Sequence, residues 1–118
     1  MDDPAAAQTP APPYYAVIFT STRTQADEGY GETLAEMLRL AATQPGYLGL
    51  ESARDARLGI TVSYWRDLEA IRIWKAMAEH RVAQRLGRER WYRYYKTRIA
   101  KVERDYEFVR QELMEDPR

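Results

Sequence analysis

The segment Tyr-Tyr-Ala-Val-Ile-Phe-Thr-Ser-Thr-Arg, residues 14–23, carries the strongest signal for the fold of this chain. Its aromatic and β-branched residues favour a β-strand. Val17 and Phe19 point to one face of this strand, whereas Ala16 and Ile18 point to the other, so both faces begin apolar. Because a strand that is apolar on both faces is covered on both faces, this segment predicts packing on either side of the sheet.

The residues after this strand predict an alternation of helices and strands. A helix over 27–44 is indicated by an apolar stripe at offsets of three and four, and Pro45-Gly46 ends it. The further expected elements are strands at 47–54 and 58–65 joined by residues 55–57, a helix at 67–79, a more polar helical stretch at 81–90, and a long strand at 92–106. Asp67 is the expected N-cap of the second helix.

The order β-α-β-β-α-β predicts an α+β, ferredoxin-like fold with a four-stranded antiparallel sheet and both helices on one face. The other face of the sheet would then lie open, although the first strand is apolar there. At about 25 cal/mol per Å² of apolar area, leaving several large side chains in water would forfeit several kcal/mol. We therefore expect a two-fold homodimer in which a second copy covers this face.

The composition sets limits on the function. The 118 residues are 45% hydrophobic and 31% charged, which is typical of a globular domain. Eighteen basic and eighteen acidic residues balance, so we expect no nucleic-acid partner, even though residues 81–104 are rich in arginine and aromatic side chains. The absence of cysteine excludes disulfides and thiolate metal sites. His80 is the only histidine, so one subunit cannot build a two-histidine metal site, and we expect no metal.

The chain is expected to contain a single domain with two short flanking segments. Residues 1–13 are rich in proline and alanine and predict a flexible arm, residues 14–108 form the domain, and residues 109–118 form a polar C-terminal tail. The sequence has neither the basic start and apolar run of a secretory signal nor a run of about 20 apolar residues. We therefore expect a cytoplasmic protein without a membrane partner.

The pattern of elements and residues resembles the antibiotic biosynthesis monooxygenase superfamily, whose members are dimeric α/β-barrels of ferredoxin-like subunits. The resemblance covers residues 14–106 and depends on the turn at 44–49 (Gln-Pro-Gly-Tyr-Leu-Gly), the strand at 59–65 (Gly-Ile-Thr-Val-Ser-Tyr-Trp), the segment at 67–71 (Asp-Leu-Glu-Ala-Ile), Trp74 and Glu79-His80. The superfamily includes cofactor-free oxygenases of polycyclic phenols, quinol oxygenases, haem-degrading enzymes and members without known activity. The resemblance therefore implies cofactor-independent oxygenation of an aromatic phenol or quinol.

The haem-degrading branch of this superfamily fits the sequence poorly. That branch uses an asparagine on the first strand, a tryptophan on the second helix, and an iron-binding histidine ten residues later. Trp74 matches the tryptophan, but the tenth residue after it is Gln84, and the first strand has Thr20, Ser21 and Thr22 where the asparagine is required. Glutamine is a poor substitute for imidazole as an iron ligand, so haem degradation is the weaker expectation.

The resemblance implies a site between the sheet and the helices. His80 is the candidate catalytic residue, because an imidazole suits proton abstraction from a phenol at neutral pH and a phenolate donates an electron to oxygen readily. The residues expected to bind a small aromatic substrate are Trp65, Trp74, Phe19, Gln84 and Arg88, the last of which could hold an anionic group.

These residues also have plain structural interpretations. A tryptophan at the position of Trp74 is more often a core residue than a wall of a cavity, and a histidine near a helix end, such as His80, is more often solvated or bound to the helix terminus. A non-catalytic dimeric module, which binds a small molecule or serves in a stress response, is therefore the alternative function.

Overall fold

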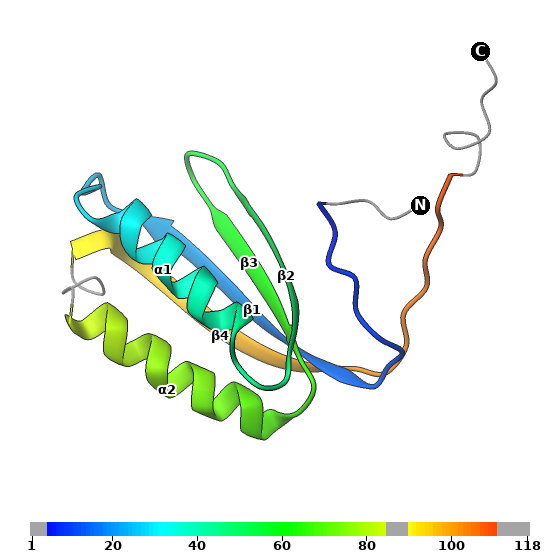
Figure 1. Cartoon of the computed structure of the whole chain (residues 1–118). Coiled ribbons are helices and arrows are strands. Elements are labelled where there is room, and N and C mark those ends of the chain that lie inside the picture. Colours follow the sequence, from blue (N-terminus) through cyan, green and yellow to red (C-terminus); the bar gives the residue numbers. More distant parts are fainter. Residues whose placement is uncertain (1–4, 85–89, 111–118) are drawn as a thin grey trace, which may run out of the picture.

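The computed structural model describes residues 5–84 and 90–110, with the side chains of residues 82–84 outside the description. It confirms the expected order of elements and the ferredoxin-like fold (Figure 1). The elements are β1 (Tyr14–Arg23), α1 (Tyr30–Ala42), β2 (Tyr47–Arg54), β3 (Gly59–Trp65), α2 (Leu68–Gln84) and β4 (Tyr92–Val102).

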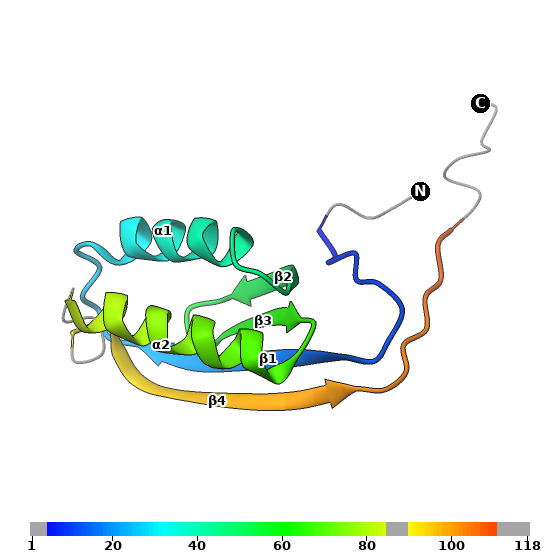
Figure 2. The same cartoon turned by 60° about the horizontal axis from the view of Figure 1, so that its bottom comes forward.

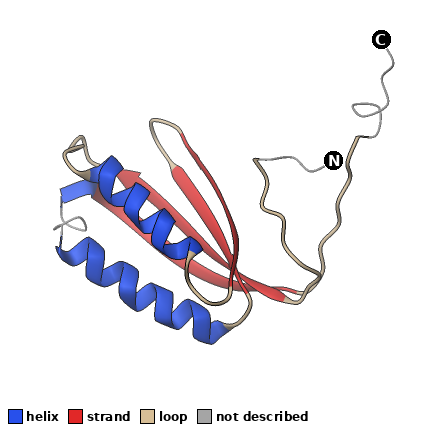
Figure 3. Cartoon of the chain, viewed as in Figure 1, coloured by secondary structure: helices blue, strands red, loops and turns tan. Residues whose placement is uncertain are grey.

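The four strands form one antiparallel sheet in the order β2-β3-β1-β4, so the first and last strands of the chain are neighbours. Both helices lie on the same face of this sheet, and none of the described residues forms a helix on the opposite face (Figures 2 and 3). Val17 and Phe19 point toward the helices, and Ala16 and Ile18 point away from them, as the alternation in the sequence predicts.

Three boundaries differ from the expected ones. The first helix begins at Tyr30 rather than near residue 27, because Gly29 adopts a left-handed conformation (φ 80°) directly before it. The second helix continues through residues 79–81 without a break, and a Lys75–Glu79 ion pair (2.8 Å) spans the turn before them. The last strand ends at Val102 rather than at residue 106, because Val102 pairs with Tyr14, the first residue of β1, and residues 5–13 before it form no strand.

The core lies between α2 and the end of β3. Trp65 is completely buried, its ring stacks on that of Trp74 at 6.1 Å, and its indole N–H donates a hydrogen bond to Ser63 Oγ (2.8 Å). Small and branched side chains of the helices, Ala41 and Ile71 among them, pack against this pair. Asp67 is the N-cap of α2, as predicted, because its carboxylate accepts a hydrogen bond from the backbone N–H of Ala70 (2.8 Å).

Glu51 links the sheet face without helices to the N-terminal residues. Its two carboxylate oxygens accept hydrogen bonds from the backbone N–H of Ala7 (3.0 Å) and from the hydroxyl of Tyr64 (2.7 Å). The ring of Tyr64 packs edge-on against that of Tyr14, whose hydroxyl in turn donates to Asp105 (2.6 Å). Residues from both ends of the chain therefore meet over one end of the open face.

No helix within the described residues is both long enough and apolar enough to cross a lipid bilayer.

Candidate functional site

A cavity of about 290 Å³ lies between the sheet and the two helices. Its volume is close to the lower limit of small-molecule pockets, roughly 300–1,000 Å³. Apolar side chains form most of its wall: Val17 comes from the sheet, Leu34 and Met37 come from α1, and Ile71 and Trp74 come from α2. A wall of this kind binds the faces of apolar or aromatic ligands and excludes water from them.

Aromatic rings from two sides of the fold line this cavity. Phe19 of β1 contacts Tyr92 edge-on, with ring centroids 5.7 Å apart, and lies at 31° to the ring of Tyr95 at 5.4 Å. The half-buried Trp74 of α2 also lines the cavity, and its ring stacks on that of Trp65. Planar surfaces on the strand side and on the helix side suit a flat aromatic ligand.

One part of the cavity wall is polar and contains a guanidinium group. Arg54, the last residue of β2, donates hydrogen bonds from Nη2 to the carbonyl oxygen of Ser21 (3.3 Å) and to the Ser21 hydroxyl. The side chain of Arg54 lies across Gly59 of β3, and a Cβ on Gly59 would overlap the guanidinium. Arg54 lines the cavity and is also exposed to solvent, so it marks a part of the cavity that opens to the outside.

A buried hydroxyl of α1 is also part of the wall. Thr33 is only 2% exposed, and its Oγ1 has no hydrogen-bond partner among the described residues. An unsatisfied buried hydroxyl is costly and therefore uncommon in folded proteins. Since Thr33 lines the cavity, a polar atom of a ligand could complete its bonding.

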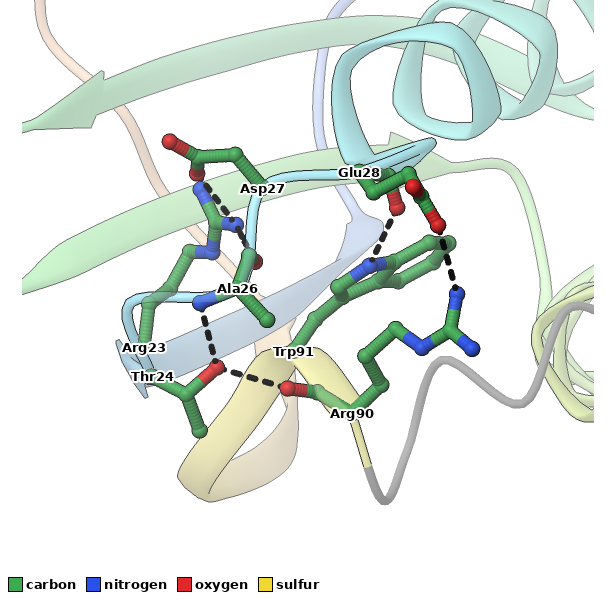
Figure 4. Close-up of polar contacts among 7 residues, drawn as sticks. All are labelled: Arg23, Thr24, Ala26, Asp27, Glu28, Arg90 and Trp91. Carbon is green, nitrogen blue, oxygen red and sulfur yellow. Dashed lines mark hydrogen bonds and ion pairs between the residues drawn. The ribbon is translucent and has the colours of Figure 1, made fainter.

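The loop between β1 and α1 is tied to the start of β4 at one end of the cavity (Figure 4). The hydroxyl of Thr24 donates to the carbonyl oxygen of Arg90 (2.6 Å), and the indole N–H of Trp91 donates to the carbonyl oxygen of Glu28 (2.9 Å). An Arg90–Glu28 ion pair at 3.6 Å lies beside them. Because Trp91 lines the cavity, these contacts fix this part of its wall.

Tyr92 carries a further hydroxyl of the cavity wall. Burial raises the pKa of Tyr92 well above its ordinary value, and the neighbouring Tyr30 raises it further, whereas the charges of Arg54 and Arg23 act in the opposite direction. The phenol therefore keeps its proton at neutral pH. It can donate or accept a hydrogen bond there, but it is not a base.

The structure brings two of the predicted site residues, Phe19 and Trp74, together in the cavity wall. Trp65 lies behind Trp74 in the core and has no exposed surface. The side chain of His80 is exposed to solvent and is not part of the cavity wall, although the preceding residue, Glu79, is.

The two remaining predicted site residues lie outside the described part of the molecule. The backbone of Gln84 ends α2, but its side chain is not described, and Arg88 belongs to residues 85–89. Within residues 5–84 and 90–110, no three histidine, cysteine, aspartate or glutamate side chains gather in a way that could hold a metal ion.

Sequence reasoning missed the polar residues of the site, namely Arg54, Ser21 and Thr33. Ser21 and Thr33 carry no pattern that separates them from other small polar residues. The pairing of Arg54 with Gly59 across a short hairpin was a usable signal, because a residue without a side chain leaves room for a long neighbour to fold over it.

Comparison with known proteins gives a consistent result. The family model described as antibiotic biosynthesis monooxygenase matches residues 13–86. The uncharacterised protein YqjZ of Bacillus subtilis is 54% identical to this chain over 98 residues, which is 82% of this chain and 86% of that protein.

Solved structures with the same fold are much more distant in sequence. SnoaB, a cofactor-independent oxygenase from Streptomyces nogalater, superposes with a TM-score of 0.65 at 14% identity, over 80% of this chain and 97% of SnoaB. PA3566 from Pseudomonas aeruginosa superposes with a TM-score of 0.62 at 20% identity, over 81% of this chain and 98% of its own. At these identities the likeness establishes the fold alone.

Proposed function

Because the chain belongs to the antibiotic biosynthesis monooxygenase family, we propose that its cavity binds a planar phenol or quinol and that the protein oxygenates this ligand without a cofactor. One observation carries the proposal: the cavity between sheet and helices is apolar and has aromatic rings, Phe19 and Trp74, on two of its sides. SnoaB, which has the same fold, is described as a cofactor-independent oxygenase, and this description is consistent with the proposal.

The reaction needs no oxidant other than dioxygen. In an anthrone, the reacting methylene carbon loses two hydrogens and gains one oxygen atom as a carbonyl, and the second oxygen atom leaves with those hydrogens as water. The enabling step is loss of a proton from the ligand to solvent water where the cavity opens to the outside, because the resulting anion transfers an electron to oxygen more readily than the neutral ring does. An apolar cavity supports this chemistry by keeping water away from the reactive intermediate.

Oxygen consumption tests the proposal. A panel of hydroquinones and anthrones is supplied to the wild type and to Trp74→Ala and His80→Ala. We expect turnover by the wild type and a loss of about ten-fold or more in Trp74→Ala, because a positioning surface for the ring is removed. An unchanged rate in His80→Ala would exclude the predicted role of this imidazole as base. No consumption by the wild type with any member of the panel would contradict the oxygenase function.

A second candidate function is a binding module of the same fold without chemistry. The exposed position of His80 supports it, because the one imidazole of the chain does not line the cavity. Calorimetric binding of the same panel, together with no oxygen consumption, is the result that would favour this candidate over the oxygenase.

We also propose that two copies associate through the sheet face that carries no helix. Ile18 and Val62 point to this face from the two central strands. After β4, residues 103–110 continue as an extended segment that leaves the domain (Figure 3). Tyr106 and Phe108 on this segment are 87% and 81% exposed, which supports their burial against a second copy.

A further inference from the structure

We propose that the polar part of the cavity wall at Arg54 and Ser21 is an anion subsite that binds an ionised oxygen of the aromatic ligand, either a phenolate or a carboxylate, and that Thr33, in the wall of the same cavity, is a further hydrogen-bond donor to this ligand. This inference rests on the proposed function, because the ligand is the ring that the cavity binds. Arg54 is the residue that would select among such ligands.

The position of Arg54 is specified by the sheet itself. In the register of the strands, Arg54 of β2 is opposite Gly59 of β3, and Gly59 is opposite Ser21 of β1. These three residues therefore form one row across the sheet. Because Gly59 has no side chain, the guanidinium can lie across β3 and reach the hydroxyl and the carbonyl oxygen of Ser21. Ser21 is itself only 2% exposed, so the guanidinium is anchored on a buried side chain.

The charge of this guanidinium is not neutralised by an ion pair. Within residues 5–84 and 90–110, no carboxylate lies within ion-pair distance of Arg54, and its Nε and Nη1 have no acceptor. The adjacent Asp55 forms no ion pair with it: the Asp55 Oδ1 accepts hydrogen bonds from the backbone N–H groups of Leu58 (2.9 Å) and Arg57 (2.7 Å), and these bonds lower the pKa of Asp55 more than the charge of Arg54 does. A fixed guanidinium with free N–H groups is well suited to an anionic oxygen.

A second observation points to a ligand in the same cavity. The hydroxyl of Thr33 is nine-tenths buried, lines the cavity and has no partner among the described residues. The acidic residue of the wall, Glu79, does not favour a cationic ligand, because its carboxylate is already paired with Lys75 at 2.8 Å. The wall thus contains a guanidinium without an ion pair and a buried hydroxyl without a partner among the described residues, and both groups can donate to an anionic oxygen.

Isothermal titration calorimetry with two matched pairs of probes tests the subsite. The carboxylate pair is 2-naphthoate and its methyl ester, and the phenolate pair is 2,4-dinitro-1-naphtholate and its methyl ether. We expect the wild type at pH 7 to bind at least one anion about ten-fold or more tightly than its neutral derivative, as a charge-assisted hydrogen bond provides. The pair that shows this preference identifies the ligand class.

Three variants connect the preference to Arg54. Arg54→Met removes the charge and keeps the length of the side chain, and we expect the anion and its neutral derivative then to bind equally. Gly59→Ala keeps the charge but blocks the path of the guanidinium, and we expect the same loss. Arg57→Met, a substitution in the neighbouring loop and outside the cavity wall, is the matched control and should retain the wild-type preference.

The outcomes separate this inference from the proposed function. Equal affinity of the wild type for anions and neutral derivatives, or a preference that survives in both Arg54→Met and Gly59→Ala, would overturn the anion subsite and leave the aromatic cavity intact. Failure of all four probes to bind would contradict the aromatic cavity itself. Gly59→Ala adds one methyl group at a residue without a positive φ, so it provides a folded test if Arg54→Met does not fold.

Discussion

Tyr64 illustrates how a single hydroxyl couples the sheet to the N-terminal residues. It donates to Glu51, and the other oxygen of that carboxylate accepts the N–H of Ala7. Burial, and then the hydrogen bond to Glu51, raises the pKa of Tyr64 to about 12 from an ordinary value of 10.0. The neutral phenol is therefore favoured in the folded protein.

This raised pKa predicts a loss of stability at alkaline pH. Below pH 10 the phenol is neutral in both the folded and the unfolded protein, and Tyr64 makes its full contribution to the free energy of unfolding. This contribution is lost as the pH rises from about 10 to about 12. We expect Tyr64→Phe to lower the free energy of unfolding by about 1–2 kcal/mol at pH 8. The difference from wild type should shrink above pH 10, as measured by urea unfolding.

A substitution at the exposed Tyr94 is the control for this experiment, because Tyr94→Phe alters a ring that is open to solvent. A difference between wild type and Tyr64→Phe that stays constant from pH 8 to pH 11 would show that the hydrogen bond to Glu51 does not stabilise the fold.

At the scale of the elements, the turn between α1 and β2 depends on a glycine. Gly46 has a φ of 88°, and a Cβ there would lie 2.7 Å from the Cβ of Ala70 at the start of α2. In contrast, a Cβ on Gly31 in α1 would meet no atom within 4 Å. One glycine is therefore required by the packing of two elements, and the other is merely tolerated in a helix.

These two glycines predict opposite effects of the same substitution. Gly46→Ala should lower the free energy of unfolding by roughly 2 kcal/mol or more, because the turn is strained and the α2 contact is overpacked. Gly31→Ala should raise it by about 0.5–1 kcal/mol through helix propensity. Thermal and urea unfolding measure both, and equal effects of the two substitutions would contradict the packing of the turn against α2.

At the scale of the whole molecule, the fold has one covered and one open sheet face, and the proposed dimer covers the open one. Each aromatic ring of Tyr106 and Phe108 could bury roughly 150–250 Å² against a partner. At about 25 cal/mol per Å², the pair could contribute several kcal/mol to association.

Sedimentation at micromolar concentration tests this assembly. We expect the wild type to be a dimer and the double variant Tyr106→Asp/Phe108→Asp to dissociate at least ten-fold more readily, with unchanged unfolding of the subunit because both rings are exposed within it. Arg57→Asp is a control that alters surface charge in the β2–β3 loop. A folded wild-type monomer at these concentrations would contradict the dimer.

The order of the elements follows from the amino-acid sequence, because hydrophobic periodicity and turn residues act over a few neighbours. Residues 14–23 were correctly predicted as a strand, and the side-chain period assigns each of its residues to a face. Phe19 and Trp74 were expected at the site from the family resemblance, and both lie in the cavity wall, whereas their binding of a substrate stays a prediction. The end of β4 at Val102 was not predictable in this way, because it depends on where β1 begins.

Only the tertiary structure decided which polar groups meet in the cavity. Arg54 and Ser21 are 33 residues apart and come together because two strand registers align them across Gly59. The exposure of His80 was decided in the same way, by the direction in which α2 packs on the sheet. Local patterns fix the face of an element, whereas contacts between distant residues depend on how the faces of all elements are brought together.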